Sequence, residues 1–125
     1  MTLKGKIVTG QGEGKKFLDL FWVKRQIQEK LQFIPCDGTL NLTLNTKSTS
    51  LRYMLKKTVY IKIKPAPGFC NGIVIPALIN SKKCAIIIPK VINYPKNKIE
   101  IIAPFNIRQI FKVKDGDEIS VQFLV

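Results

Sequence analysis

Residues 39–45 read Thr-Leu-Asn-Leu-Thr-Leu-Asn, and this alternation indicates the class of fold. Leu40, Leu42 and Leu44 occupy every second position, with threonine and asparagine between them. Successive side chains of a β-strand point to opposite faces of a sheet, so the leucines share one face and the polar residues share the other. The stretch therefore predicts a half-buried β-strand.

Much of the remaining chain is also expected to form β-strands. Further strands are expected over residues 3–8, 16–20, 58–64, 69–79, 84–88, 99–102 and 118–124. Turns are expected over residues 65–68, 80–83 and 114–117, and a loop over residues 46–57. Many short strands separated by turns predict a mainly β fold that closes into a small barrel, because closure removes exposed strand edges.

Two segments have helical character. Residues 22–32 carry apolar side chains at about one helical turn, and the resulting stripe is expected to pack on the core. The stripe consists of Val23, Ile27, Leu31 and Ile34. Asn106 is a preferred N-cap residue and predicts a brief helix through residue 111.

Length and composition bound the kind of protein. A chain of 125 residues with 46% hydrophobic residues can build one modest core, so a single domain over residues 1–125 is expected. No apolar run approaches the roughly 20 residues that cross a bilayer, and the first residues lack a signal-peptide pattern. We expect a cytoplasmic protein with no membrane partner, and a monomer.

Cysteine and histidine usage excludes several active sites. The chain has no histidine, which rules out a Ser-His-Asp triad and other histidine-based catalysis. Cys36, Cys70 and Cys84 form no CxxC pair, so a zinc site is not expected. Each cysteine is expected to act as a small buried or half-buried apolar residue.

The net charge of +13 predicts an anionic partner, either a phosphorylated ligand or nucleic acid. The lysines are scattered rather than gathered in one block. A solvated basic surface without a dedicated partner is therefore the alternative interpretation.

Residues 10–15 read Gly-Gln-Gly-Glu-Gly-Lys and form a candidate phosphate-binding loop. Glycine permits positive φ and lets backbone N–H groups approach an anion closely. The segment fits neither the Walker A pattern nor the dinucleotide fingerprint, whose third glycine comes one residue later. An ordinary glycine-rich turn is the alternative.

Three further residues offer chemistry. Thr39 and Asn41 share a strand face and present hard oxygen ligands that suit Mg²⁺ when phosphates supply the negative charge, although a solvent-facing strand is the alternative. Glu100 is a lone carboxylate in an apolar strand and could bind a polar ligand edge or act as a base. A charge on an edge strand is the alternative for Glu100.

Four motifs occur in one order along the chain: residues 10–14, 38–42, 100–104 and 114–117. In this order and spacing the whole chain resembles the archaeal CTP-dependent riboflavin kinases. The resemblance implies a compact six-stranded cradle-loop barrel related to swapped-hairpin barrels. It implies transfer of the γ-phosphate of CTP to the ribityl 5′-hydroxyl of riboflavin, giving FMN and CDP, with Mg²⁺ and without a prosthetic group.

The resemblance also implies residue roles. The residues that would wrap the CTP phosphates are Gly10, Gln11, Gly12, Glu13, Gly14 and Lys15. Those that would line the nucleotide site are Phe105, Asn106, Ile107 and Arg108. Thr39 and Asn41 would hold Mg²⁺, and Glu100 would contact the flavin and orient or deprotonate the hydroxyl.

One departure from the family concerns the flavin. The family often has Thr-His-Tyr where this chain has Ile-Asn-Tyr over residues 92–94, so Ile92 lacks the threonine hydroxyl. Loss of such a bond costs about 0.5–1.5 kcal/mol, so weaker or rearranged riboflavin binding is expected.

The competing hypothesis is a small basic barrel that binds nucleic acid without catalysis. Such a surface usually adds exposed aromatic side chains for base stacking. In this chain Phe17, Phe33, Phe111 and Phe123 occupy expected core positions. A nucleic-acid partner is therefore not favoured.

Overall fold

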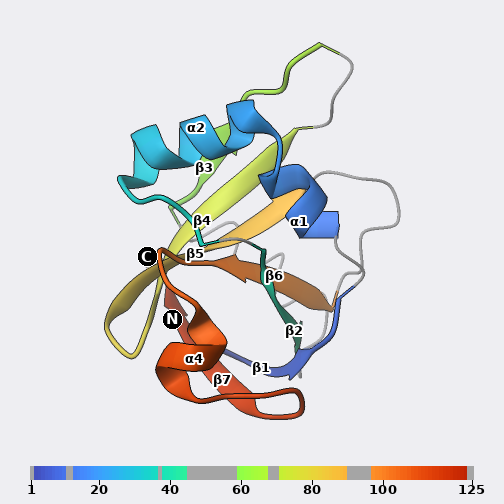
Figure 1. Cartoon of the computed structure of the whole chain (residues 1–125), viewed down its shortest axis with the longest axis vertical. Coiled ribbons are helices and arrows are strands. Elements are labelled where there is room, and N and C mark those ends of the chain that lie inside the picture. Colours follow the sequence, from blue (N-terminus) through green and yellow to red (C-terminus); the bar gives the residue numbers. More distant parts are fainter. Residues whose placement is uncertain are drawn as a thin grey trace.

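The computed structural model describes residues 2–10, 13–36, 38–44, 59–67, 71–89 and 97–123 (Figure 1). The strands are β1 (Thr2–Val8), β2 (Leu40–Leu44), β3 (Ile61–Ile63), β4 (Gly72–Ile79), β5 (Lys82–Pro89), β6 (Lys98–Ile102) and β7 (Glu118–Phe123). The helices are α1 (Glu13–Leu18), α2 (Phe21–Leu31) and α4 (Ile107–Phe111). None of these helices is long and apolar enough to span a membrane.

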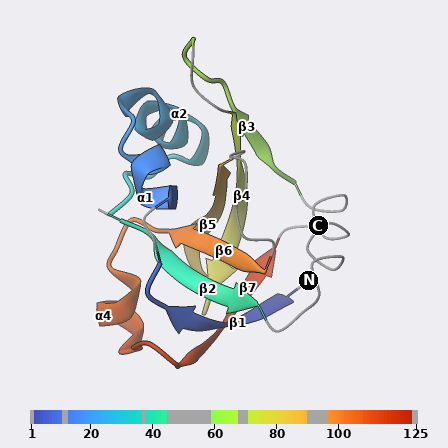
Figure 2. The same ribbon diagram turned by 90° about the vertical axis from the view of Figure 1, so that its right-hand side faces the viewer.

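Six antiparallel strands close into a barrel (Figure 2). They follow the order β4-β5-β6-β2-β1-β7, and β7 then pairs with β4 to complete the ring. The closing contact sets Ala77 opposite Phe123 and Leu78 opposite Gln122. The expected mainly β, six-stranded barrel is therefore confirmed. Outside the ring of six, β3 pairs with residues 72–74 at the start of β4.

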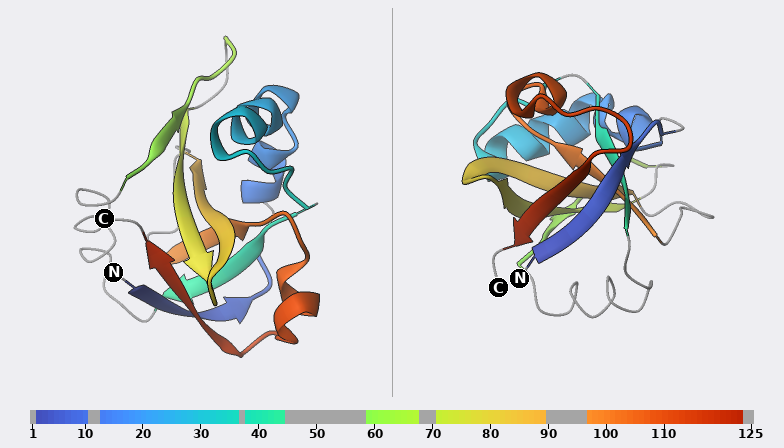
Figure 3. Two further views of the ribbon diagram at one scale, coloured as in Figure 1. Left: turned by 90° about the vertical axis from the view of Figure 1, so that its left-hand side faces the viewer. Right: turned by 90° about the horizontal axis from the view of Figure 1, so that it is seen from below.

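The described residues form two apolar clusters, which hold the fold together. The first fills the barrel and includes Leu42, Ile75, Ile86 and Ile99, all nearly inaccessible to solvent. The second lies between the barrel wall and helices α1 and α2, which stack beside β4 and β5 (Figure 3). Because the wall is covered on both faces there, β4 and β5 have continuous apolar runs instead of a strict alternation.

The β4–β5 hairpin follows from its turn residues. Asn80 and Ser81 have φ angles of 46° and 66°, as the two-residue type I′ turn requires. Asparagine adopts this left-handed region more readily than most residues. The expected turn is confirmed, with the strands extending to Ile79 and from Lys82.

The prediction of a strand over residues 16–20 is wrong, because this segment belongs to helix α1 and the bend that follows it. A five-residue segment is too short for periodicity to distinguish the two structures. Helical geometry places Phe17 and Leu18 in the second apolar cluster. Gly72 on β4 permits this packing, because a Cβ atom there would overlap the Phe17 ring.

The helix over residues 22–32 is confirmed as α2, with one correction to its apolar stripe. Val23 and Ile27 are buried and Leu31 is half-buried, but Ile34 is 69% exposed. Gln32 ends the helix in a left-handed conformation with φ of 60°, so Ile34 leaves the helical face.

The remaining elements follow the prediction closely. The expected strand over residues 58–64 shortens to β3, and Val59 is 56% exposed. The Asn106 cap is confirmed, because Asn106 Oδ1 accepts a hydrogen bond from the Gln109 backbone N–H at 3.1 Å. The expected loop over residues 46–57 lies outside the described residues.

Candidate functional site

Three neighbouring strands bring the polar candidates together on the outer surface of the barrel wall. Glu100 on β6 pairs with Asn41 on β2, and Asn41 pairs with Val8 at the end of β1. Asn41 is 8% exposed and Glu100 is 0% exposed. Both are therefore buried polar groups, and they require polar partners.

Glu100 receives a hydrogen bond from Thr39. The Thr39 hydroxyl Oγ1 donates to Glu100 Oε1 over 2.7 Å, although the residues are 61 positions apart in the sequence. β6 is paired with β5 on one side and β2 on the other, so Glu100 is not a charge on an edge strand. The solvent-facing alternative for Asn41 is wrong, because Asn41 is only 8% exposed.

Gly10 lies directly against Asn41. A Cβ atom built on Gly10 would overlap the Asn41 side-chain amide, so only glycine permits this approach without a shift. Asn41 Oδ1 is buried and accepts no hydrogen bond from the described residues. A buried acceptor without any partner costs about 1–3 kcal/mol, so a donor or cation bound at this oxygen would be favourable.

The donor atoms at this point fit Mg²⁺. Asn41 Oδ1 and Thr39 Oγ1 are neutral hard oxygens, and the Glu100 carboxylate accepts a hydrogen bond from Thr39 Oγ1. The described residues contain no group of three or more histidine, cysteine, aspartate or glutamate side chains arranged to hold a metal. A metal held by Thr39 and Asn41 would complete its shell with phosphate and water oxygens.

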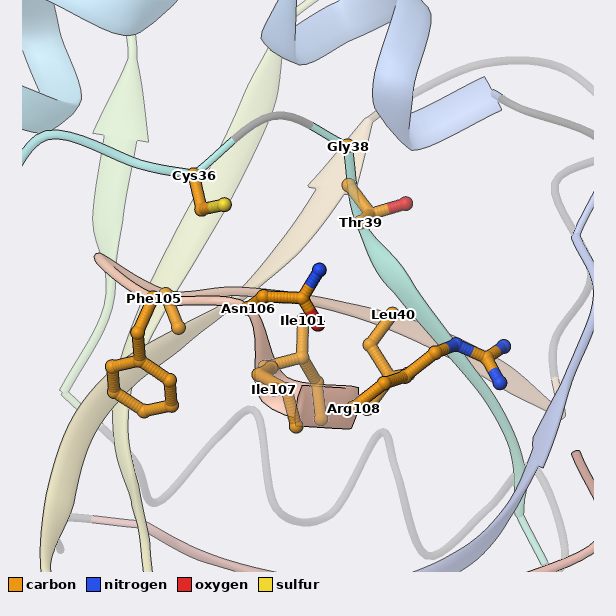
Figure 4. Close-up of a pocket in the computed structure, with 10 residues that line it drawn as sticks. Cys36, Gly38, Thr39, Leu40, Ile101, Phe105, Asn106, Ile107 and Arg108 are labelled. Carbon is orange, nitrogen blue, oxygen red and sulfur yellow. The ribbon is translucent and has the colours of Figure 1, made fainter. Parts of the chain in front are cut away.

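A pocket of about 120 Å³ opens beside Thr39 (Figure 4). Phe105, Asn106, Ile107 and Arg108, all expected to form the nucleotide site, contribute to its walls. Asn106 uses its side-chain oxygen to cap α4, which leaves the amide nitrogen turned toward the pocket. The structure thus brings this segment together with Thr39.

The Phe105 ring packs against protein more than it faces the pocket. Its centroid lies 5.8 Å from that of Phe111 in an edge-on arrangement, and Lys82 Nζ lies 5.9 Å from its centroid. In Figure 4 the ring points away from Thr39. Phe105 therefore supports the pocket wall through its packing.

Arg108 at the other side of the pocket is held by Asp115. Arg108 Nη2 donates to Asp115 Oδ1 over 2.7 Å, and Thr9 Oγ1 donates to Asp115 Oδ2 over 2.7 Å. The hydrogen bond from Thr9, followed by that from Arg108, lowers the pKa of Asp115 below its usual value. From the sequence, residues 114–117 are expected to form a turn and count as one of the four motifs of the resemblance, but the contact between Asp115 and Thr9 is not predicted.

The glycine-rich segment is described in part. Gln11 and Gly12 lie outside the described residues, whereas Glu13 and Gly14 begin helix α1. Lys15 Nζ lies 2.9 Å from Asp19 Oδ2 in an exposed ion pair, which lowers the Asp19 pKa. Exposed pairs of this kind contribute little to the free energy of folding. Ile92 also lies outside the described residues.

The cysteines agree with their expected passive role where they are described. Cys84 is buried, and burial raises the pKa of its thiol to about 12. Cys36 is half-buried and lines the pocket beside Gly38 and Thr39. Cys70 lies outside the described residues.

Known proteins resemble this chain over nearly its whole length. The model of the CTP-dependent riboflavin kinase family, described as a domain of unknown function (DUF120), matches residues 7–123. A riboflavin kinase of Methanosarcina barkeri is 37% identical over 98% of this chain and 56% of its own length. Riboflavin kinases of Ignicoccus hospitalis and Saccharolobus solfataricus are 39% and 36% identical, over 70% and 74% of their lengths.

The matches cover a larger share of this chain than of its relatives. The chain is covered almost completely, but it spans little more than half of the Methanosarcina barkeri relative. The family match includes the whole of β2, β6 and α4 and the last two residues of β1. The chain therefore belongs to the family of CTP-dependent riboflavin kinases.

Proposed function

We propose that this protein is a riboflavin kinase that uses CTP as phosphate donor and Mg²⁺ as metal, and that it produces FMN and CDP. The observation that carries the proposal is the buried Asn41 oxygen, which lacks a described partner and lies beside Gly10 and Glu100. A metal bound to a nucleotide phosphate would satisfy that oxygen. The family membership supports the same reaction.

The phosphates of CTP would bind at the glycine-rich segment. Backbone N–H groups of Gly12 and Gly14 would donate to phosphate oxygens, and Lys15 would supply a positive charge. Gly10 keeps the segment close to Asn41, since a larger residue does not fit there. The γ-phosphate would therefore lie near the oxygens proposed to hold the metal.

The metal oxygens complete the phosphate site. Bound Mg²⁺ would neutralise charge on the phosphate oxygens and help to orient them. Thr39 and Asn41 would hold it through Oγ1 and Oδ1. Glu100 keeps the Thr39 hydroxyl hydrogen directed toward its own carboxylate, which leaves the lone pairs of Thr39 Oγ1 available for the metal.

In the transfer itself, the 5′-hydroxyl oxygen of riboflavin would form a bond to the γ-phosphorus. The bond from that phosphorus to the β,γ-bridging oxygen would break, and CDP would leave with the electron pair. Glu100 is the proposed acceptor for the hydroxyl proton and the proposed contact for the flavin. Positioning and charge neutralisation contribute most in phosphoryl transfer, so little assistance from a base is required.

The pocket beside Thr39 would hold the cytosine ring. Asn106 turns its amide nitrogen toward the pocket, and this donor suits the O2 and N3 acceptors of cytosine. Arg108 provides a second set of donors at the rim. Ile92 remains a predicted weak point for flavin binding, and Ile92→Thr should lower the KM for riboflavin.

The decisive experiment measures FMN by chromatography after incubation with riboflavin, Mg²⁺ and each of the four nucleoside triphosphates. FMN formation with CTP alone is the expected result. Asn41→Leu should abolish it, because leucine removes the metal oxygen from a buried position. Thr43→Val is the matched control, since Thr43 lies two residues further along the same face of β2.

Two results would contradict the proposal. Turnover unchanged in Asn41→Leu would disprove the metal assignment. Failure of all four triphosphates, together with RNA binding that weakens steeply as salt rises, would favour the nucleic-acid module instead.

A further inference from the structure

Asp115 connects two walls of the site, each through a different carboxylate oxygen. Oδ2 accepts from the hydroxyl of Thr9, the residue immediately before Gly10. Oδ1 accepts from the guanidinium of Arg108, which lines the nucleotide pocket. Both distances are 2.7 Å, within the usual range of charge-assisted hydrogen bonds.

The backbone around Asp115 is fixed independently of these two contacts. Gly116 N donates to Ile7 O over 2.8 Å, and Ile7 N donates to Asp117 O over 2.9 Å. The turn is also closed on itself, because Lys114 N donates to Asp117 Oδ2 over 2.9 Å. Asp115 therefore projects from a turn that is already held against the end of β1.

Asp115 contributes mainly to the geometry of the site and little to the free energy of folding. The Arg108 and Asp115 side chains are 40% and 52% exposed, and exposed ion pairs contribute little to folding. A long arginine side chain without a partner would sample many rotamers, and ordering it on nucleotide binding would cost affinity. A carboxylate that holds Arg108 in place removes that cost in advance.

We propose that Asp115 is a positioning residue for the nucleotide. It holds Arg108 at the rim of the pocket and Thr9 at the base of the glycine-rich segment, so that the base site and the phosphate site keep one spacing. Asp115 itself touches neither substrate. This inference rests on the proposed function, because it assigns CTP to the same site.

The test compares the kinetics of four variants with those of the wild-type chain. Asp115→Ala should raise the KM for CTP about tenfold, the equivalent of one charge-assisted hydrogen bond, while the KM for riboflavin changes less than about twofold. Thr9→Val should raise the KM for CTP by a smaller factor, and Thr9→Ser should restore it. Adding Thr9→Val to Asp115→Ala should cause no further loss.

Asp117→Ala is the matched control. It removes a carboxylate from the same turn, but one whose hydrogen bond within the described part of the chain is to the Lys114 backbone N–H. A merely structural role of the turn would make both aspartate variants behave alike. The inference expects Asp117→Ala to lower the melting temperature while leaving the KM for CTP within about twofold of wild type.

Calorimetric titration with CDP and Mg²⁺ separates this inference from the proposed function. If the wild-type chain binds CDP but forms no FMN, the kinase proposal fails, and a weaker Kd for CDP in Asp115→Ala still supports the positioning role. An unchanged KM and Kd in a folded Asp115→Ala chain would overturn the positioning role alone. Absence of any CDP binding by the wild-type chain would overturn both.

Discussion

Gly10 packs so closely on Asn41 that a Cβ atom on residue 10 would overlap the Asn41 side-chain amide. The glycine-rich segment therefore begins in contact with the strand that carries the proposed metal oxygens. The distance between the two parts of the site is set by the absence of a side chain at residue 10.

Gly10→Ala should destabilise the fold by about 1–3 kcal/mol, because the added methyl group overpacks a buried contact. Urea unfolding gives this free energy directly. In an Asn41→Ala background the same substitution should cost much less, since the amide that it meets has been removed. Equal costs in the two backgrounds would show that Gly10 and Asn41 do not touch.

Thr39→Val should destabilise the chain by about 1–3 kcal/mol, because it removes a donor from a fully buried carboxylate. Thr39→Ser keeps the hydroxyl and should recover most of that free energy. Both variants should be unfolded in urea without metal or nucleotide, so that the Glu100 contact is measured by itself. Equal stability of the valine and serine variants would contradict the contact.

Asn41→Asp should bind a divalent cation without a nucleotide. The wild-type site offers neutral oxygens, which hold a bare cation weakly, and an added carboxylate supplies the missing charge. Electron paramagnetic resonance of Mn²⁺ reports the free ion. The expected result is Mn²⁺ binding by the wild-type chain only with CDP present, and by Asn41→Asp in its absence.

Cys84 should resist alkylation in the native state. Its thiol is buried and has a pKa of about 12, so almost no thiolate is present at neutral pH. Mass spectrometry after iodoacetamide treatment should show Cys36 modified before Cys84. Early modification of Cys84 in the folded chain would mean that the first apolar cluster opens far more readily than the burial of Cys84 indicates.

Acid stability should depend on Asp115. Its pKa is lower in the folded chain than in the unfolded chain, because Thr9 and Arg108 donate to the ionised form. The folded chain thus binds this proton less well than the unfolded chain. The contribution of Asp115 to the free energy of unfolding is present above its unfolded pKa of 3.8, and it is lost as pH falls through the lower folded pKa. Between pH 5 and pH 3, the melting temperature should fall less in Asp115→Asn than in the wild-type chain.

The strand pattern of the fold could be predicted from local sequence. Leucines at every second position of β2 and the Asn80–Ser81 turn each determine a local structure. Residues 16–20 could not be assigned in this way, because Phe17 and Leu18 become buried only when α2 and β5 are present to cover them. Tertiary packing, and not propensity, determines that segment.

In the candidate site, the residues could be predicted from the sequence but their contacts could not. Thr39, Asn41 and Glu100 could be selected from their residue types and strand positions, but the contact between Thr39 and Glu100 depends on the register of β2 against β6. The contact between Thr9 and Asp115 joins residues 106 positions apart. No local sequence pattern encodes a contact between residues so far apart in the chain, since the contact arises from the pairing of β1 with β7.

The pairing of β1 with β7 also has a consequence for synthesis of the chain. While the ribosome is still adding residues 100–117, β1 lacks one of its two neighbouring strands, and β4 lacks the contact that closes the ring. Contacts between such distant residues form slowly, after the cost of closing the intervening loop. The arrangement of β1 beside the turn at residues 114–117 is therefore completed late, and a nascent chain should gain full nucleotide affinity only once β7 has left the exit tunnel.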